Sequence, residues 1–479
     1  MLQRPEKFYV TTPIYYVNDK PHIGSAYTTI AADVLARFYR YAGIQTFFLT
    51  GTDEHGSKME RAAKAAGKTP EEFTREMSAK FSFAWDTLGI ASDDFIRTSE
   101  DRHVKAVQEF LLALKDSGKL YEGEYEGFYC VGHEAFITES DLDDKGLCPD
   151  HKTKPEKLKE KNWFFKLSDY QNILLKNIEE NEFIIEPESR RNEVLAFVNQ
   201  GLQDVAISRP NVRWGIPLPW DKSQTVYVWV DALFNYASAL GYPHGENYQK
   251  FWPADLQLVG KDIIRFHCVI WPALLEAAGI PLPKKVFAHG FFTVNGQKIS
   301  KSLGNVIDPM ELANKFGPDA VRYFLLREIP FGQDGDFSLE KLKNRYEADL
   351  ANGLGNLFSR LTTLIATNLD GKVPDILESP RKFDEVDELV SSLRFHEALS
   401  RIWEEVAWAN KYIDETKPWE TAKKDPKLFN EVISNLAAHL FEIAKKLSPF
   451  MPETSEKIRS ALSAERIEKA KPLFPRLIE

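Results

Sequence analysis

The first hundred residues alternate between short apolar runs and longer stretches with apolar positions at helical spacing. Residues 8–12 and 46–50 are predicted strands, and helices are predicted from about Gly24 and over 59–66 and 70–88. Strands that alternate with helices in this way predict a parallel, doubly wound α/β sheet.

The alternation of strand and helix signals stops after residue 116 and resumes near residue 221. Strand-like runs at 225–230, 256–259 and 286–294 alternate with helical stretches, whereas only helical periods run from about 338 to 463. We therefore expect an α/β domain that is interrupted by an insertion and followed by an all-α helical bundle. The expected segments are 1–116 and 221–337 for the two halves of the α/β domain, 117–220 for the insertion, and 338–479 for the bundle.

Composition excludes several classes of protein. Lys and Arg number 61 against 71 Asp and Glu, a formal charge of −10, so bulk positive charge does not hold this chain to nucleic acid, although local basic patches remain open. Three cysteines are too few for a disulfide framework and fit a reducing compartment. No apolar run approaches the roughly 18 residues that cross a bilayer, and the N-terminus has no leader pattern. We expect a cytoplasmic protein that does not enter membranes, and the alternative is the mature form of a protein that an organelle imports.

The segment from Pro21 to Ser25 lies between the first predicted strand and the first helix. A helix N-terminus in a doubly wound sheet offers free N–H groups and a partial positive charge to a phosphate. Gly24 lets a ligand approach the backbone, and His22 can donate a hydrogen bond to a phosphate oxygen. The alternative is an ordinary helix start capped by Ser25.

A second candidate for phosphate binding is the loop at 295–305, which follows an apolar strand. It contains Lys298 and Lys301 together with two serines and a glycine, so it can place positive charge over a triphosphate. The alternative is a solvated basic loop. Each segment alone is weak evidence for a phosphate-binding site, but two such segments in this order are a much more specific signal.

Together the two segments resemble the signature motifs of class I aminoacyl-tRNA synthetases. His22-Ile23-Gly24-Ser25 is similar to the His-Ile-Gly-His motif, with Ser25 in place of the second histidine, and residues 298–302 are similar to Lys-Met-Ser-Lys-Ser, with Ile299 in place of methionine. The resemblance implies a Rossmann-like fold, Mg²⁺-ATP as substrate, and catalytic roles for His22, Lys298 and Lys301. The implied ATP-binding residues are His22, Gly24, Ser25, Gly260, Asp262, Lys298 and Lys301.

Within this class the chain resembles the methionyl-tRNA synthetases over nearly its whole length. The matching stretches are residues 11–18, 52–56, 208–217, 227–232, 260–263 and 288–290. The resemblance implies that Asp53 holds the substrate ammonium group and that the Tyr236 hydroxyl meets the sulfur. The implied methionine-binding residues are Ile14, Tyr16, Asp53, Trp229, Ala232, Leu233, Tyr236 and His289. A core-packing role remains the interpretation for Val226, Val228 and Val230.

Two pairs of potential metal ligands lie in the insertion. Cys130 and His133, and Cys148 and His151, have the spacing and the residue types of a tetrahedral zinc knuckle. The resembling family often has a knuckle here with cysteine at the second position, and some members have lost the metal. We expect one structural Zn²⁺, and a metal-free knuckle is the alternative.

The predicted bundle carries the residues that the resemblance assigns to the anticodon. Asn356 and Arg360 stand four residues apart on one helix face, and Trp419 follows a Lys-Pro turn. Hydrogen bonding and aromatic stacking are the chemistry by which unstacked bases are recognised. Without the resemblance, a solvated helix face would be the better interpretation. The chain ends soon after the bundle, so we expect a monomer.

The resemblance implies activation of L-methionine by ATP and transfer to initiator and elongator methionine tRNA. Two alternatives stay open: another small class I synthetase, such as that for cysteine, and a non-catalytic tRNA-binding paralogue. The stretch from Trp229 to Tyr236 argues against the first alternative, because a thiol-specific site normally uses zinc in the pocket itself. The intact lysines at 298 and 301 argue against the second.

Overall fold

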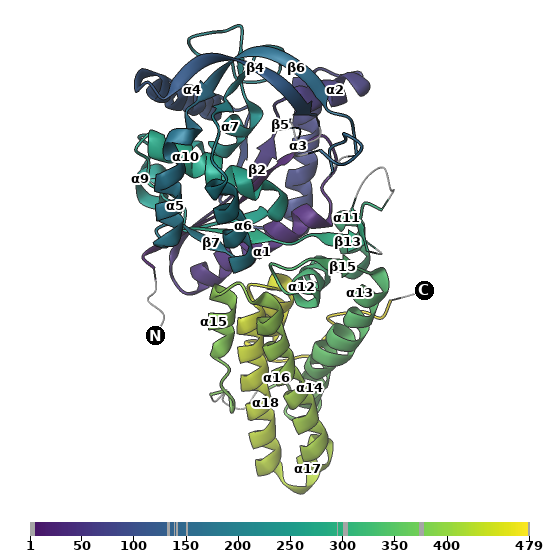
Figure 1. The fold of residues 1–479 in the computed structure, drawn as a ribbon. Helices are drawn as coiled ribbons and strands as arrows, with labels where there is room; N and C mark the ends of the chain where they lie inside the picture. The colour runs from purple at the N-terminus through teal and green to yellow at the C-terminus, as the bar shows by residue number, and fades with distance from the viewer. Residues whose placement is uncertain are drawn as a thin grey trace.

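The computed structural model describes residues 5–131, 135–137, 139, 142–149, 152–294, 296–299, 305–372 and 378–477. Its centre is a parallel sheet in the order β3-β2-β1-β11-β12-β7, the predicted doubly wound arrangement (Figure 1). The strands are β1 Lys7–Tyr16, β2 Gln45–Asp53, β3 Asp94–Arg97, β7 Ile184–Glu186, β11 Leu256–Gly260 and β12 Lys285–His289. The strand β7 lies within 117–220, so this segment contributes an edge strand to the central sheet.

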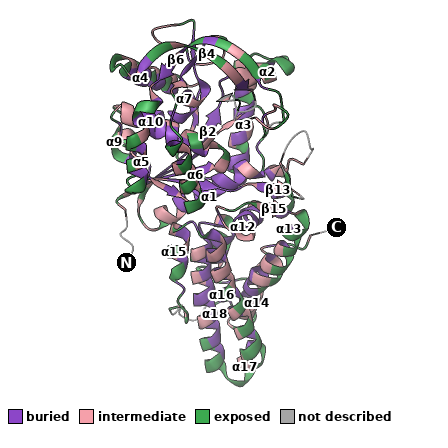
Figure 2. Cartoon of the chain, in the orientation of Figure 1, coloured by how far each residue is buried: buried purple, intermediate pink, exposed green. Residues whose placement is uncertain are grey.

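Helices cover both faces of the sheet, because the strands are apolar on each face. One core joins β1 and α1 to α3, α12 and the bundle, and the other joins β1 and β2 to α4, α5, α6 and α10. Purple, buried positions line both layers in Figure 2. The helices of this domain are α1 Ile23–Tyr41, α2 Ser57–Ala65, α3 Pro70–Thr87, α4 Asp101–Asp116, α5 Gln171–Glu179, α6 Glu188–Asn199, α9 Glu246–Phe251, α10 Trp271–Ala277, α11 Pro309–Phe316 and α12 Pro318–Glu328.

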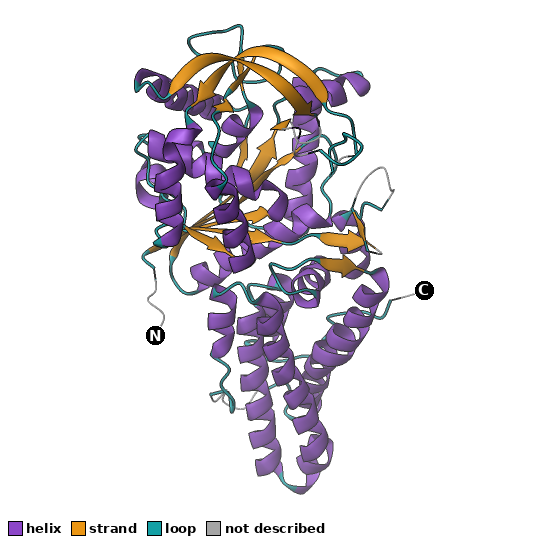
Figure 3. Ribbon diagram, viewed as in Figure 1, coloured by secondary structure: helices purple, strands orange, loops and turns teal. Residues whose placement is uncertain are grey.

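A long antiparallel ribbon arches over the top of this domain (Figure 3). It consists of β4 Leu120–Cys130 and β6 Glu156–Phe165, flanked by β5 Ala135–Ile137 and β8 Val205–Ala206. Its solvent face is a ladder of exposed ion pairs, in which Lys161 lies 2.6 Å from Glu122 and Lys159 lies 3.7 Å from Glu126. Such pairs each contribute about 0–1 kcal/mol.

Two predicted strands are wrong in part. The run 225–230 is a strand only at β10 Thr225–Val226, which pairs with β9 Ser208–Arg209, and α7 Val228–Leu233 follows it at once. Val228 and Val230 are buried as expected, but on a helix. The run 286–294 divides into β12 and β13 Phe292–Val294, which belongs to a separate sheet with β14 Gln297–Lys298 and β15 Gly335–Phe337. Gly290 lies between the two, where the chain passes so close to Gln333 that a Cβ would lie 2.3 Å from the Gln333 backbone.

The C-terminal part is the predicted helical bundle (Figure 1). Its helical elements are α13 Leu339–Arg345, a π-helical segment Tyr346–Gly355, α14 Asn356–Asn368, α15 Glu385–Ser391, α16 Phe395–Thr416, α17 Pro418–Lys424, α18 Pro426–Leu447 and α19 Pro452–Leu462. None of the helices within the described ranges has the length and apolarity of a bilayer span.

One buried arginine joins the bundle to the α/β domain. Arg322 on α12 is fully buried and donates to the carboxylate of Asp33 on α1 at 2.6 Å. It also donates to the carbonyl oxygens of Pro449 and Phe450, in the turn between α18 and α19, at 2.9 and 2.8 Å. The guanidinium group therefore links the middle of α1 to the bundle.

Candidate active site

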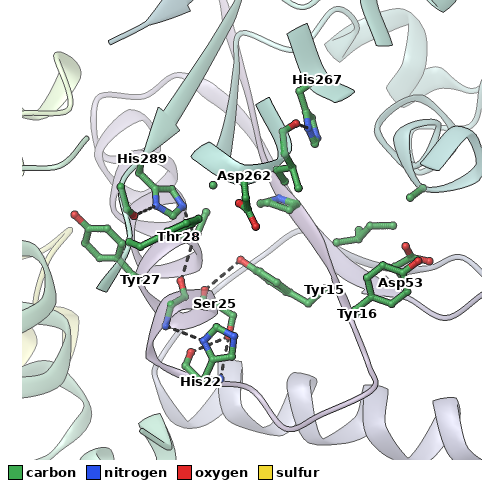
Figure 4. Close-up of a pocket in the computed structure, with 18 of the residues that line it drawn as sticks. Tyr15, Tyr16, His22, Ser25, Tyr27, Thr28, Asp53, Asp262, His267 and His289 are labelled. Carbon is green, nitrogen blue, oxygen red and sulfur yellow. Dashed lines mark hydrogen bonds between the residues drawn. The ribbon is translucent and has the colours of Figure 1, made fainter. Parts of the chain in front are cut away.

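The candidate site is a cavity at the carboxyl ends of the central strands. In a sheet of this order, the switch point lies between the neighbouring strands β1 and β11, because the chain continues from them to opposite edges of the sheet. Ligands bind in the crevice there. Asp53, Gly260 and His289 are the last residues of β2, β11 and β12, and all three line this cavity of about 330 Å³. The first turn of α1 closes one side of it (Figure 4).

The start of α1 is shaped by its own side chains. His22 is the N-cap, and its Nδ1 accepts the backbone N–H of Gly24 at 3.1 Å. In a neutral ring this leaves the hydrogen on Nε2, where it is available to an acceptor. The hydroxyl of Ser25 accepts the His22 backbone N–H at 3.1 Å, which completes a capping box. Serine at this position therefore stabilises the helix start.

Two glycines line the cavity, at the start of α1 and at the end of β11. A Cβ at Gly24 would lie 2.9 Å from the His22 ring, and a Cβ at Gly260 would lie 2.6 Å from the Asp262 carboxylate. Asp262 lies two residues after the end of β11, and its carboxylate faces the cavity in Figure 4. The backbone can approach a ligand closely at both positions.

The second motif reaches the same cavity. The backbone of Lys298 belongs to β14, which pairs with β13, and Ile299 lines the cavity. The Lys298 side chain and all of Lys301 lie outside the described residues. Ile299 and His22, which are 277 positions apart in the chain, thus border one space.

The other half of the cavity is a largely apolar slot. Its wall comes from α7 and from α8 Asn235–Ser238, and the Trp229 ring stacks on Phe266 with centroids 3.8 Å apart. Asp53 lies at its edge with 3% of its surface exposed. All eight residues predicted for methionine line this cavity: Ile14, Tyr16, Asp53, Trp229, Ala232, Leu233, Tyr236 and His289.

Two buried histidines line the slot and both are held by hydrogen bonds. His289 Nδ1 lies 2.8 Å from the Gly290 carbonyl oxygen, and its Nε2 lies 2.6 Å from the Thr28 hydroxyl. His267 Nδ1 lies 3.0 Å from the Ile263 carbonyl oxygen. Burial lowers the pKa of each ring to about 4, so both are neutral at pH 7.

These two histidines predict a loss of stability in mild acid. Their pKa is lower in the folded chain than the usual 6.5, so the unfolded chain binds more protons below pH 6.5, and folding stability falls from there toward pH 4. Each shift corresponds to about 3 kcal/mol at most. Urea unfolding at pH 7, 6, 5 and 4.5 measures the slope. His267→Phe should flatten it, whereas the same change at exposed His244 should not, and an unchanged slope in both would contradict the assignment.

A buried carboxylate behind the slot fixes α7 to β2. Asp231 on α7 contacts His55 Nδ1 and His103 Nε2, each at 2.7 Å, and the two imidazoles hold the pKa of this carboxyl below its usual value against the opposing effect of burial, which is the largest single influence. His55 lies two residues after Asp53. The Asp231 hydrogen bonds therefore tie α7, which forms the wall of the slot, to the segment that carries Asp53.

Several cavity residues were not predicted from the sequence. Tyr15, Thr28, Ile263 and His267 also line the space. Thr28 lies one helical turn after Gly24, so helix geometry alone could have suggested it. His267 gave no sequence signal, because only the fold brings its segment to the slot.

The predicted metal ligands are described only in part. Cys130 ends β4 and Cys148 lies in a turn closed by the Lys152 N–H on its carbonyl oxygen at 2.8 Å. Both cysteines are buried and not in disulfides. His133 and His151 lie outside the described residues. These two cysteines are side chains of the type that binds zinc, and both are shielded from solvent.

Of the three residues predicted for the anticodon, Asn356 and Arg360 lie in the first turns of α14 and Trp419 lies on α17, the helix labelled at the far end of the bundle in Figure 1. Arg360 donates to Asp414 at 2.6 Å, and its guanidinium lies 5.8 Å from the Trp419 ring centroid. Asn356 donates to Asn410 at 3.3 Å. Trp419 is 48% exposed, so an aromatic face and two polar side chains form one accessible patch.

Known proteins share this architecture. Residues 8–156 and 150–362 match the family described as tRNA synthetases class I (M), and residues 381–474 match the anticodon-binding domain of tRNA ligase. The methionine–tRNA ligase of Thermotoga maritima is 49% identical, over 96% of this chain and 76% of its own. That of Rickettsia felis is 48% identical, over 98% and 94%. The structure of the Mycobacterium tuberculosis methionyl-tRNA synthetase in complex with methionyl-adenylate superposes with a TM-score of 0.93 at 40% identity, over 98% of this chain and 100% of that one.

Proposed function

Because the chain belongs to the class I methionyl-tRNA synthetases and is a methionine–tRNA ligase that uses ATP, we propose that the cavity beside α1 carries out both steps of its reaction. In the first step, the methionine carboxylate attacks the α-phosphate of ATP, and pyrophosphate leaves. In the second, the 3′-terminal adenosine of methionine tRNA attacks the carbonyl of methionyl-adenylate, and AMP leaves.

The proposal rests chiefly on one observation. His22 and Ile299, from the two phosphate-handling motifs, border the same cavity as the slot formed by Trp229 and Tyr236. An amino-acid pocket and a triphosphate pocket that share one space place the reacting carboxylate beside the α-phosphate. Such positioning supplies much of the rate enhancement of phosphoryl chemistry.

The roles of single residues follow from their places. Asp53 binds the ammonium group, because it is a buried carboxylate at the edge of the slot. His22 donates Nε2–H to a phosphate oxygen, and Asp262 accepts from the ribose. Lys298 and Lys301 neutralise the leaving pyrophosphate from the opposite side. Mg²⁺ would accompany the triphosphate and neutralise part of its charge.

Pyrophosphate exchange into ATP tests the amino-acid specificity. The purified chain is incubated with each of the twenty amino acids in turn, and methionine alone should support exchange. Exchange with cysteine but not methionine would favour the cysteine enzyme, and no exchange with any amino acid would favour a non-catalytic tRNA-binding protein. Intact binding of a methionine tRNA transcript in that last case would distinguish a binding protein from a misfolded one.

The bundle patch is proposed to bind the anticodon of initiator and elongator methionine tRNA alike. Trp419 offers a stacking surface, and Asn356 and Arg360 offer hydrogen bonds. Charging of a transcript with the methionine anticodon should far exceed charging of one with an altered anticodon. Equal charging would argue against the patch. The cytoplasmic location and the monomeric state stay predictions from the sequence.

One structural Zn²⁺ is proposed at Cys130, His133, Cys148 and His151. The two buried, reduced cysteines support it. Bound metal would fix the turn beyond the β4–β6 ribbon. We expect metal analysis of chelator-free protein to give about one zinc per chain, and Cys148→Ser to lose it. Cys268→Ser is the matched control, because Cys268 is buried in a different core. A fully active preparation without zinc would contradict the proposal.

A further inference from the structure

Tyr15 joins the end of β1 to the first turn of α1. Its hydroxyl oxygen lies 3.1 Å from the Ser25 carbonyl oxygen and 2.7 Å from the Thr29 hydroxyl, and Figure 4 shows the ring reaching across to the helix. The Thr29 hydroxyl lies 2.8 Å from the same carbonyl oxygen, so the three oxygens form a closed triangle. A carbonyl oxygen only accepts, and each hydroxyl carries one hydrogen. Tyr15 is therefore hydrogen-bonded to α1 in every arrangement of these hydrogens.

A β-bulge directs the Tyr15 side chain to this face of the sheet. The register of β1 against β2 shifts between Thr11 and Ile14, which adds one residue to β1. After the bulge, Ile14 packs with the core on the side of the slot, whereas Tyr15 packs with the core that contains α1 and α3. The Tyr15 ring centroid lies 5.8 Å from that of Phe81 and 5.7 Å from that of Trp85, both on α3. The ring is thus fixed by α3 with its hydroxyl against α1.

Tyr15 stands between the two halves of the cavity. Its neighbours in the chain, Ile14 and Tyr16, line the part that binds methionine in our proposal, and its partner Ser25 ends the first phosphate-handling motif. The Ser25 hydroxyl is occupied within the helix start, because it accepts the His22 backbone N–H at 3.1 Å and donates to the His22 carbonyl oxygen at 2.8 Å. Its single hydrogen is therefore used in holding the turn.

Building on the function proposed above, we propose that Tyr15 is a positioning residue for the formation of methionyl-adenylate. Through its hydroxyl it fixes the distance between the strand end that binds methionine and the helix start that binds the triphosphate. The methionine carboxylate and the α-phosphate approach each other from these two sides, and a misplacement of about 1 Å can cost about 100-fold in rate. Burial raises the pKa of Tyr15 to about 12, so the hydroxyl keeps its hydrogen at pH 7.

Tyr15→Phe tests the proposal, because it removes the hydroxyl and keeps the ring against Phe81. In pyrophosphate exchange, kcat should fall about tenfold, the value of one hydrogen bond, while the KM values for methionine and ATP change less than about threefold. Transfer from preformed, enzyme-bound methionyl-adenylate to methionine tRNA should keep its single-turnover rate. The two parts of the adenylate are already joined, so their alignment no longer depends on the contact between β1 and α1. A merely structural role would slow both steps.

Tyr346→Phe is the matched control. Tyr346 is buried in the bundle, and its hydroxyl likewise donates to a backbone carbonyl oxygen, that of Pro475 at 2.8 Å. This variant should leave kcat unchanged. A comparable fall in kcat there would show that the loss does not depend on the place of Tyr15, and would overturn the proposal.

Two changes at the buried Thr29 give an independent test. Thr29→Val removes the hydroxyl with little change of shape and should also lower kcat, whereas Thr29→Ser keeps the hydroxyl and should retain the wild-type kcat. The losses of Tyr15→Phe and Thr29→Val should not add in the double variant, because both break the same triangle of hydrogen bonds.

Thermal melting establishes which variants are folded. A folded Tyr15→Phe with the wild-type kcat, an equal loss in the transfer step, or fully additive losses in the double variant would overturn the proposal. If Tyr15→Phe does not fold, Thr29→Val decides, and an unchanged kcat in that variant would overturn it. A wild-type chain that supports no exchange with methionine would instead refute the proposed function.

Discussion

Asp53→Asn should lower kcat/KM for methionine by about 10²–10³-fold in pyrophosphate exchange. The side chain keeps its shape but loses the charge that faces the substrate ammonium in our proposal. Asp53 is only 3% exposed, so water compensates poorly for that loss. Removing one partner of a buried charged pair costs about 2–5 kcal/mol. The effect should lie mainly in the methionine KM, with the ATP KM nearly unchanged.

The same substitution at Asp86, on the exposed side of α3, is the matched control and should leave both constants unchanged. Thermal melting of both variants confirms that they are folded. A folded Asp53→Asn protein that binds methionine as tightly as the wild type would remove Asp53 from the binding site. An equal rise in both KM values would indicate a general distortion of the cavity.

The second large effect concerns stability. Arg322→Ala should lower the free energy of unfolding by about 3–5 kcal/mol, because it leaves the Asp33 carboxylate and the Pro449 and Phe450 carbonyls without this donor in a buried space. Urea denaturation at pH 7 measures the change. Because Arg322 joins α1 to the bundle, the two parts should also unfold less cooperatively in the variant.

Two variants place limits on this interpretation. Arg75→Ala removes an arginine that pairs with Glu71 at 2.7 Å on an exposed helix face, and should cost no more than about 1 kcal/mol. Arg322→Met fills the space with an apolar side chain and should cost less than the alanine variant. A loss at Arg322→Ala no larger than that at Arg75→Ala would show that the buried pair contributes little.

The sequence predicted the fold class well where the local pattern and the tertiary structure agree. The alternating strands and helices of the α/β domain and the helices of the C-terminal bundle could be predicted from local hydrophobic spacing alone. The run 225–230 was misjudged, because its β-branched residues favour a strand, whereas burial against the second core makes 228–230 helical. Tyr227 is the N-cap residue of this helix, but its side chain makes no capping hydrogen bond. No local sequence signal therefore marked the start of the helix.

Only those residues of the candidate site that lie in recognisable sequence motifs could be predicted. His22, Asp53 and Trp229 lie in stretches that resemble a family, and they line one cavity. His267 and Asp231 were not predicted, because their roles arise from partners far away in sequence: Tyr236 lies 31 residues from His267, and His103 lies 128 residues from Asp231. Hydrogen-bond direction is a property of the assembled structure and leaves no pattern in the chain.

The charged ladder on the β4–β6 ribbon does not by itself specify the register of the two strands. Glutamates recur at every second position of one strand and lysines at every second position of the other, so a slip of two residues would still match opposite signs. The register must come from the buried face of the ribbon, where Leu120 faces Phe165 in the core and Glu160 accepts a hydrogen bond from the Arg209 guanidinium at 2.9 Å. The exposed glutamates and lysines of the arch can thus vary in sequence, while the buried side chains beneath them decide which residues meet.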